Sequence, residues 1–268
     1  MKLIGCQFDL VWENKRANFE KVRRLLGAAN PLKGALVALP EMFATGFSMN
    51  VAEIAEPRGG VTEQFLAATA REFGVAILGG VVTPGRGNQG RNEAVVFTSE
   101  GKELARYTKM HCFNPSGEGD HYEAGNQPVV FPWADFKVAP FVCYDLRFPE
   151  IFRVTAAKGA QVLAVIANWP TARLQHWMVL LQARAIENQA YVIGVNRCGN
   201  TPKLAYAGRS LIIDPRGVIL AEAGEQEGIL SAELDLAGLE AYRKEFAVLP
   251  DMRAEYVKAD AGSRREGV

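Results

Sequence analysis

The clearest structural pattern in the chain lies in the stretch VAPFVCYDLRFPEIFRVTAAKGAQVLAVIANWP, residues 138–170. Its apolar runs at 138–142 and 162–167 predict two buried strands. Phe148–Pro149–Glu150 predicts the start of a helix between them, because Pro is favoured in the first helical turn. The order strand, helix, strand is typical of an α/β domain in which helices cover mixed sheets.

The same alternation continues on both sides of this stretch. Asn14 is expected to cap a first helix, and a second helix is expected to begin at Thr62 and stop at Gly74. A long third helix is expected over about 173–189. Further strands are predicted at 3–8, 35–39, 75–82, 94–98, 104–108, 191–195, 210–213, 218–220 and 229–234. The order of elements resembles two similar halves, although no residue-level repeat is visible.

The pattern predicts a single domain over residues 1–250, followed by a C-terminal extension over 251–268. The last residues, AGSRREGV, have nothing to bury, so the end of the extension is expected to be flexible. Residues 109–128 are irregular and rich in Gly, Asn and Pro. A loop of this length inside a compact domain is usually functional or mobile.

Composition excludes several classes of protein. The 268 residues carry 30 Lys and Arg and 30 Asp and Glu, whereas a dedicated nucleic-acid binder normally has a basic excess. No apolar run approaches the roughly 20 residues of a membrane helix, and the N-terminus lacks the apolar core of a secretory signal. The four cysteines form no CxxC pair, which argues against zinc, and free thiols favour a cytoplasmic location. We therefore expect no nucleic-acid partner, no membrane partner and no metal.

Chemically distinctive residues follow four of the predicted strands. Glu41 follows the strand at 35–39 through Pro40, and Lys109 follows 104–108. Cys143 and Asn168 follow the two strands of the opening stretch. Ligands of open α/β sheets gather at the carboxyl ends of strands, so these side chains are candidates for one site. Taken singly, each also fits a structural role: a loop acid, a solvated lysine or a small buried hydrophobe.

Cys143 lies between a buried strand and the expected helix. A helix N-terminus and a nearby lysine would both lower the pKa of a thiol in that position. A papain-type pair with His111, His121 or His176 is conceivable, but no local signature for it is present.

Five stretches of the chain together resemble the nitrilase superfamily of carbon–nitrogen hydrolases. They are LPEMFATGFS (39–48), RYTKMHCF (106–113), FVCYDLRFPEIFR (141–153), ANWPTARLQHWMVLLQARAIENQAYVIGVNRCG (167–199) and GRSLIIDPRGVIL (208–220). The resemblance runs from about residue 2 to residue 250. The combination of CYDLRFPE with NWPTARLQHW looks most like the bacterial branch of ω-amidases, which hydrolyse the terminal amides of 2-oxoglutaramate and 2-oxosuccinamate.

This resemblance implies a fold and a set of catalytic residues. The family fold is a four-layer α-β-β-α sandwich. Members usually dimerise so that their sheets stack into a longer sandwich, so a homodimer is expected. The family triad of Glu, Lys and Cys falls on Glu41, Lys109 and Cys143. Glu118 is the candidate for the second glutamate that many members carry, and the main-chain N–H of Tyr144 is a candidate oxyanion donor. No cofactor is expected, because the cysteine supplies the nucleophile.

The substrate that the resemblance implies has a carboxylate at its far end. Arginine binds a planar carboxylate through paired hydrogen bonds, and Arg147 and Arg173 are the candidates. Each also has a structural interpretation, since Arg147 could pair with Glu150 and Arg173 could be a solvated charge at a helix start. The remaining candidate substrate-binding residues are Trp169, Phe43 and Asn168.

Two alternatives to an ω-amidase stay open at this point. The same triad could act on a nitrile, an N-carbamoyl amine or a simple aliphatic amide, because the triad does not set the substrate. A non-catalytic binding or assembly protein on the same fold is the second alternative, although all three triad residue types are intact.

Overall fold

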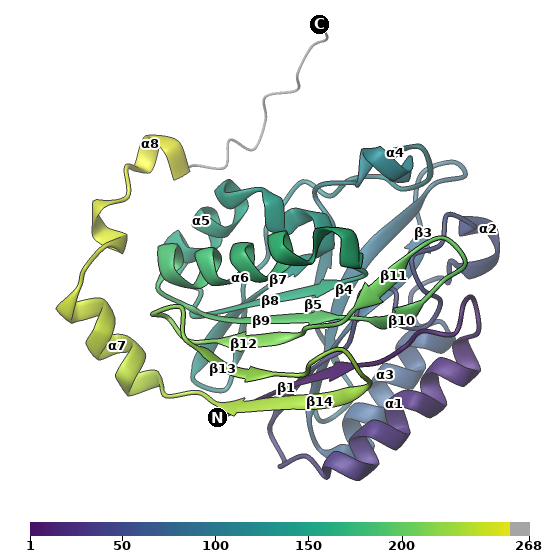
Figure 1. Ribbon diagram of the computed structural model, residues 1–268, viewed down its shortest axis with the longest axis horizontal. Coiled ribbons are helices and arrows are strands. Elements are labelled where there is room, and N and C mark those ends of the chain that lie inside the picture. The colour runs from purple at the N-terminus through teal and green to yellow at the C-terminus, as the bar shows by residue number, and fades with distance from the viewer. Residues whose placement is uncertain (258–268) are drawn as a thin grey trace, which may run out of the picture.

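In the computed structural model, which describes residues 1–257, two six-stranded sheets pack face to face and helices cover their outer faces (Figure 1). Helices α1 (Lys15–Ala29) and α3 (Val61–Phe73) cover one sheet, and α5 (Pro149–Ala157) and α6 (Leu174–Asn188) cover the other. Buried side chains fill the space between the sheets and the space under each helix pair. The predicted α/β class and α-β-β-α sandwich are confirmed.

The first sheet has the strand order β14-β1-β2-β3-β4-β5. Its central pairs β1–β2 and β2–β3 are parallel, and the remaining pairs are antiparallel. The strands are β1 (Lys2–Gln7), β2 (Leu36–Ala38), β3 (Ala76–Pro84), β4 (Gly90–Phe97), β5 (Glu103–Thr108) and β14 (Gly228–Glu233).

The second sheet, ordered β13-β12-β9-β8-β7-β6, repeats this plan with a parallel centre and antiparallel edges. Its strands are β6 (Phe131–Trp133), β7 (Phe136–Val142), β8 (Val162–Ala167), β9 (Tyr191–Asn196), β12 (Leu211–Ile213) and β13 (Ile219–Glu222). A separate hairpin is formed by β10 (Cys198–Asn200) and β11 (Ala205–Ala207). The two halves of the chain are thus alike in topology.

The helix boundaries follow the expected local signals. The side chain of Asn14 accepts a hydrogen bond from the main-chain N–H of Ala17 at 3.1 Å and so caps α1. Gly74 ends α3 in the left-handed conformation that glycine tolerates best. The long helix expected over 173–189 is α6, preceded by a short 3₁₀ turn, η3 (Thr171–Arg173).

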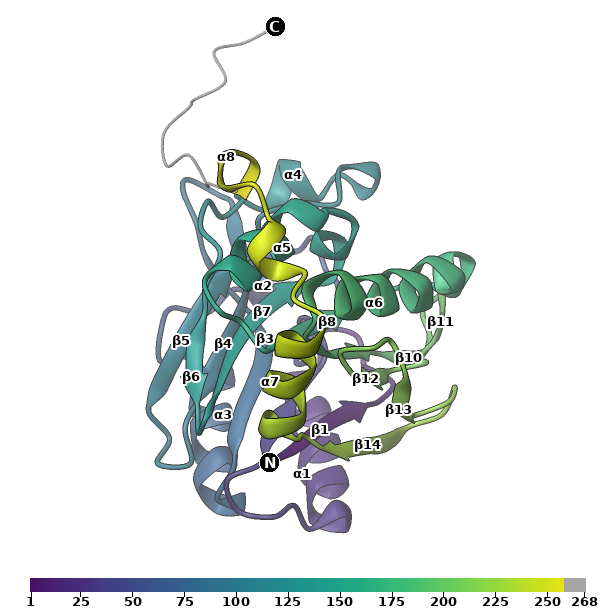
Figure 2. The same cartoon turned by 90° about the vertical axis from the view of Figure 1, so that its left-hand side faces the viewer.

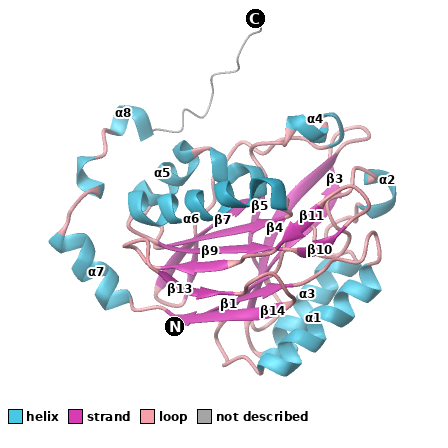
Figure 3. Ribbon diagram, in the orientation of Figure 1, coloured by secondary structure: helices cyan, strands magenta, loops and turns pink. Residues whose placement is uncertain are grey.

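Short elements fill segments that the sequence analysis left irregular (Figure 3). They are α2 (Val51–Ile54), η1 (Asn114–Ser116), α4 (Glu118–His121), η2 (Cys143–Arg147), α7 (Leu236–Glu245), η4 (Leu249–Asp251) and α8 (Ala254–Val257). Helices α7 and α8 run along one side of the sandwich (Figure 2). None of the helices within residues 1–257 is long and apolar enough to cross a membrane. The end of the extension, expected to be flexible, lies outside the described residues.

Candidate active site

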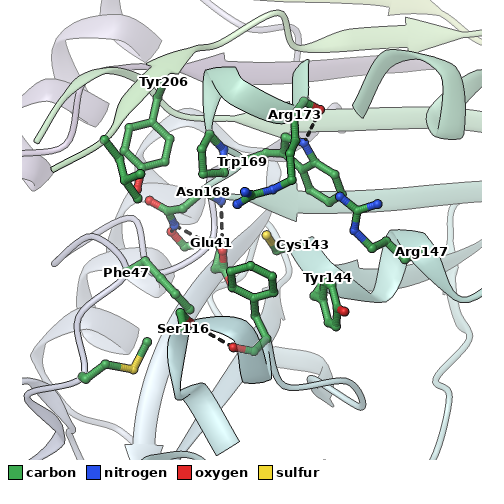
Figure 4. Close-up of a pocket in the computed structure, with 14 residues that line it drawn as sticks. Glu41, Phe47, Ser116, Cys143, Tyr144, Arg147, Asn168, Trp169, Arg173 and Tyr206 are labelled. Atoms are coloured by element: carbon green, nitrogen blue, oxygen red, sulfur yellow. Dashed lines mark hydrogen bonds between the residues drawn. The ribbon is translucent and has the colours of Figure 1, made fainter. Parts of the chain in front are cut away.

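The four strand ends singled out in the sequence meet at one place. Glu41 follows β2 and Lys109 follows β5 in the first sheet, whereas Cys143 follows β7 and Asn168 follows β8 in the second. Glu41, Cys143 and Asn168 lie around one pocket (Figure 4). The site therefore needs both sheets, because each sheet contributes two of its polar side chains.

Lys109 lies between two carboxylates in the protein interior. Its Nζ donates to Glu41 Oε1 at 3.0 Å and to both oxygens of Glu118 at 2.9 and 2.8 Å. All three side chains are at most 1% exposed. Burial alone would lower the pKa of the Lys109 ammonium, but the charges of Glu41 and Glu118 raise it well above its ordinary value. Lys109 is consequently a fixed positive charge at neutral pH.

Two asparagines complete the hydrogen bonding of the Glu41 carboxylate. Oε1 also accepts from the Asn92 amide at 2.7 Å, while Oε2 accepts from the main-chain N–H of Asn168 at 2.9 Å. The Asn168 amide donates to the main-chain oxygen of Glu41 at 2.7 Å and, at 3.3 Å, to Oε2. Glu41 is thus held as a hydrogen-bond acceptor on both of its oxygens.

Cys143 is the first residue of η2, and its backbone is in the left-handed region with φ of 47°. This backbone conformation is unusual for residues other than glycine and asparagine. Residues strained in this way cluster at functional sites. The turn sends the chain from β7 into η2 and leaves the Cys143 side chain facing the pocket beside Glu41 (Figure 4).

The expected lowering of the Cys143 pKa is wrong. Burial and then the negative charge of Glu41 raise the pKa of this thiol well above its ordinary value. Lys109 and the main-chain N–H of Asn168 act in the opposite direction but do not prevail. The resting residue is therefore a neutral thiol, and a single turn of 3₁₀ helix does not offset the desolvation of a thiolate.

Asp145 connects the segment around Lys109 with the turn around Cys143. Its Oδ2 accepts from the Tyr107 hydroxyl at 2.7 Å and from the main-chain N–H of Val142 at 3.0 Å. Its Oδ1 accepts from the main-chain N–H of His111 at 3.0 Å and lies 2.9 Å from Nδ1 of the same residue. Asp145 is fully buried, so these contacts are shielded from solvent.

The pocket over the cysteine is small, about 180 Å³, and mostly apolar. It is lined by Glu41, Phe47, Met49, Phe113, Ser116, Cys143, Tyr144, Arg147, Asn168, Trp169, Pro170, Arg173, Leu204 and Tyr206. Phe113 and Ser116, from the irregular segment at 109–128, are therefore part of its wall. The aromatic rings of Phe113 and Tyr144 contact each other edge to face, with centroids 4.9 Å apart.

Two half-buried guanidinium groups line this pocket. The Arg147 guanidinium lies over the Trp169 ring, 4.8 Å from its centroid, and contacts His176 Nδ1 at 3.2 Å. The Arg173 guanidinium lies 5.2 Å from the centroid of Phe113. Within residues 1–257 neither arginine forms an ion pair, so the alternative pairing of Arg147 with Glu150 does not occur.

A scan against family models matches residues 4–244 to the carbon–nitrogen hydrolase family. The chain belongs to this family. The 2-oxoglutaramate amidase of Bacillus subtilis is 37% identical over 254 residues, which cover 94% of this chain and 98% of that protein. The omega-amidase YafV of Yersinia enterocolitica is 40% identical over 94% of this chain and 96% of that protein. The solved structure of XC1258 from Xanthomonas campestris, a CN-hydrolase superfamily protein with an arsenic adduct in its active site, superposes with a TM-score of 0.88. It is 33% identical and covers 94% of this chain and 97% of that chain.

Most candidate residues of this carbon–nitrogen hydrolase lie together, with one exception. Lys109 forms a buried cluster with Glu41 and Glu118. Cys143 lines the pocket next to this cluster, together with Glu41. Phe43, expected to wall the pocket, needs a correction, because its ring is fully buried under the helices with Phe19 and Phe65 at centroid distances of 6.0 and 6.1 Å. Two residues after Glu41 the chain has turned away from the pocket.

Sequence reasoning missed several residues of this site. Asn92 and Asp145 contact the cluster and its supporting turn, and Phe47, Phe113 and Tyr206 line the pocket. The sequence does hold one sign of Asn92: it is a polar residue in β4, just before the apolar part of that strand. Its main-chain oxygen accepts from the N–H of Lys109 at 2.9 Å, so the two residues are cross-strand neighbours.

Proposed function

We propose that this enzyme hydrolyses the terminal amide of 2-oxo dicarboxylic acid monoamides, such as 2-oxoglutaramate and 2-oxosuccinamate, and releases ammonia. The observation that carries the proposal is the pair of arginines, Arg147 and Arg173, beside the cysteine pocket and without a carboxylate partner in residues 1–257. A free guanidinium at a half-buried position is suited to a substrate carboxylate. The names of the similar amidases from Bacillus and Yersinia support the same substrate class.

The reaction begins with a proton transfer inside the cluster. Because the resting thiol is neutral, Glu41 accepts the proton from Cys143 as the sulfur attacks the amide carbon. The new C–S bond turns the carbonyl oxygen into an oxyanion. Glu41 then returns the proton to the amide nitrogen, the C–N bond breaks, and ammonia leaves a thioester on Cys143.

The second half of the reaction regenerates the cysteine. Glu41 takes a proton from a water molecule, whose oxygen attacks the thioester carbon. The C–S bond breaks, the acid product forms, and the proton passes to the Cys143 sulfur. Glu41 is thus the only proton shuttle that the two steps need.

Oxyanion stabilisation falls to Lys109 and to the main-chain N–H of Tyr144. Although burial lowers it, the charges of Glu41 and Glu118 raise the pKa of Lys109 well above its ordinary value, so the resting enzyme holds an ammonium at this position. Removal of one donor from an oxyanion site typically costs ~3–4 kcal/mol, or about a hundred- to a thousand-fold in rate. Glu118 contributes by accepting hydrogen bonds from Lys109 Nζ with both of its oxygens.

The substrate lies with its amide at Cys143 and its carboxylate toward the arginines. Trp169 supports Arg147 by stacking, and its indole N–H donates to the main-chain oxygen of Arg173 at 2.8 Å. This one tryptophan therefore contacts both arginine positions. The Asn168 side chain lies next to Glu41 at the pocket (Figure 4).

Ammonia release from 2-oxoglutaramate tests the proposal, with wild type measured beside Cys143→Ala. Cys112→Ala is the matched control, because Cys112 is a partly buried thiol on the loop that follows Lys109. Turnover that is lost in Cys143→Ala and kept in Cys112→Ala supports both the nucleophile and the substrate class. Absence of turnover by folded wild type would overturn the substrate class.

The rival substrates are tested in the same assay. A nitrile, an N-carbamoyl amine and an aliphatic amide without a carboxylate place no negative charge near Arg147 and Arg173. We expect each to be turned over with a lower kcat/KM than 2-oxoglutaramate. A higher kcat/KM for any of them would reassign the enzyme within its family.

We also propose that the enzyme is a cytoplasmic homodimer. Four free cysteines in the described residues support a reducing compartment. Val179 and Ile186 on α6 are 53% and 52% exposed, which supports an apolar contact between two copies. Light scattering on the purified protein distinguishes a monomer from a dimer.

A further inference from the structure

The amide of Asn92 bridges the two buried glutamates of the cluster. Its Nδ2 donates to Glu41 Oε1 at 2.7 Å and to Glu118 Oε1 at 3.0 Å. Asn92 is 1% exposed, and its Oδ1 has no hydrogen-bond partner among the described residues. The flipped amide would place Oδ1 against two carboxylate oxygens, so the NH₂ group must face them. In this orientation Asn92 makes both hydrogen bonds through Nδ2, while its buried Oδ1 has no partner within residues 1–257.

The two oxygens of Glu41 differ in what they accept. Oε1 accepts from a charged donor, Lys109 Nζ at 3.0 Å, and from the Asn92 amide. Oε2 accepts one good hydrogen bond, from the main-chain N–H of Asn168, and a longer one at 3.3 Å from its side chain. Both lone-pair directions of Oε1 are occupied by strong donors, so Oε2 is the oxygen with capacity for a proton.

Oε2 accepts its hydrogen bonds from Asn168, which lines the same pocket as Cys143. The main-chain N–H of Asn168 donates to Glu41 Oε2 and also acts on the Cys143 sulfur. In the close-up, Glu41 and Cys143 lie on the same side of Asn168 (Figure 4).

We propose that Asn92 is a positioning residue, whose amide holds Glu41 Oε1 beside Lys109 so that Oε2 is the oxygen that exchanges the proton with Cys143. The proposal rests on the role of Glu41 as proton acceptor and goes beyond it, because it selects the reacting oxygen and names the group that selects it. Asn92 touches neither the substrate nor the sulfur, so it acts through Glu41.

The charged and titratable groups of the cluster that Asn92 contacts come from several elements. They are Glu41 after β2, Lys109 after β5, Cys112 in the following loop, Glu118 in α4, Tyr122 after α4, and Cys143 in η2. Hydrogen bonds to a carboxylate favour its ionised form, so removal of a donor lets a proton stay on the cluster to higher pH.

Asn92→Leu removes both N–H donors and keeps the branched shape of the side chain. We expect kcat to fall about ten- to a hundred-fold, the range of one or two hydrogen bonds to charged groups, with KM changed little. The acid limb of the kcat/KM profile should move to higher pH. Asn92→Ser keeps one small donor and should shift both quantities in the same direction by less. It also keeps the test valid if Asn92→Leu does not fold.

Asn188→Leu is the matched control. Asn188 is fully buried in α6 and donates to a main-chain oxygen at 2.9 Å and to a Glu187 oxygen at 3.4 Å; within residues 1–257 its Oδ1 also has no hydrogen-bond partner. Its loss should lower the melting temperature and leave kcat and the acid limb unchanged.

Alkylation of Cys143 by iodoacetamide provides a second measurement that needs no substrate. We expect Asn92→Leu to slow alkylation at neutral pH and to shift its pH dependence as it shifts kcat/KM. A wrong substrate class would abolish ammonia release in wild type and leave the alkylation result intact. Folded variants with kcat within twofold of wild type and an unmoved acid limb would overturn the role of Asn92. So would a loss of kcat that disappears when rates are divided by the concentration of alkylatable Cys143.

Discussion

The Tyr107 hydroxyl donates to Asp145 Oδ2 at 2.7 Å, and this bond joins two segments that belong to different sheets. Tyr107 lies two residues before Lys109, and Asp145 lies two residues after Cys143. The same carboxylate accepts from Val142 on one side of the nucleophile and from His111 beyond the lysine. Asp145 therefore links the segment that carries Lys109 to the turn that carries Cys143.

Tyr107→Phe removes this link without changing the shape of the side chain. Asp145 keeps its other donors but loses one of its hydrogen bonds in a fully buried position. We expect the free energy of unfolding to fall by ~1.5–3 kcal/mol, because the acceptor is charged. Urea denaturation measures the change. Tyr191→Phe removes two 3.2 Å bonds, one to the main-chain oxygen of Asp235 and one from its N–H, and should have the smaller effect because both partners are neutral; the reverse order would contradict this account.

Glu118→Gln should reduce kcat more than it changes KM. Lys109 donates to both oxygens of Glu118, so the variant loses the carboxylate that fixes the ammonium on one side. We expect about a hundred-fold lower kcat in steady-state ammonia release, from the loss of hydrogen bonds between charged groups. Glu123→Gln, a few residues along the chain, breaks an ion pair with Arg91 nearer the surface and should leave kcat unchanged. Equal effects of the two variants would contradict the role of Glu118.

The central strands could be predicted from sequence because they are buried on both faces. Two of them, Val162–Ala167 and Leu36–Ala38, are continuous apolar runs. Because both faces of such a strand are buried, its sequence has no alternating polar positions. The three-residue strand Phe131–Trp133 has a proline at its centre and was missed. Helix α7 was missed because Leu239 alone in it is buried, so its apolar stripe is weak.

The site residues likewise include some that the sequence predicts and some that it does not. Strand ends point to Glu41, Lys109 and Cys143, because topology brings strand ends together. Asn92 lies inside a strand rather than at a strand end, and its role follows from its contacts with Glu41 and Glu118. The pKa of Cys143 is raised mainly by desolvation, and the depth at which a residue is buried cannot be read from its neighbours in the sequence.

Alkaline pH should destabilise the fold through its buried thiols. Burial raises the pKa of Cys6 far above its ordinary value, and that of Cys198 to about 11. The unfolded chain loses these protons from about pH 8.5, so it binds fewer protons than the folded chain above that pH, and stability falls as pH rises. Each such thiol contributes a slope of up to ~1.4 kcal/mol per pH unit.

Cys6→Ala should flatten this slope, as measured by urea denaturation between about pH 8 and 10. Val22→Ala is the matched control, because Val22 lies in the same core cluster and does not titrate. It should lower the free energy of unfolding at every pH and leave the slope unchanged. An unchanged slope in Cys6→Ala would show that the Cys6 thiol does not stay protonated in the fold.

Arg147→Met should distinguish charged from uncharged substrates. If the guanidinium binds the distal carboxylate, kcat/KM for 2-oxoglutaramate falls by about ten- to a hundred-fold, since a charge-assisted hydrogen bond is lost. An aliphatic amide of similar length without the carboxylate should change by less than threefold, because its reacting end meets Cys143 in the same way. Arg91→Met, whose guanidinium pairs with Glu123 away from the pocket, should change neither. Equal losses for both substrates in Arg147→Met would mean that the arginine supports the pocket through its stacking on Trp169 and does not recognise the carboxylate.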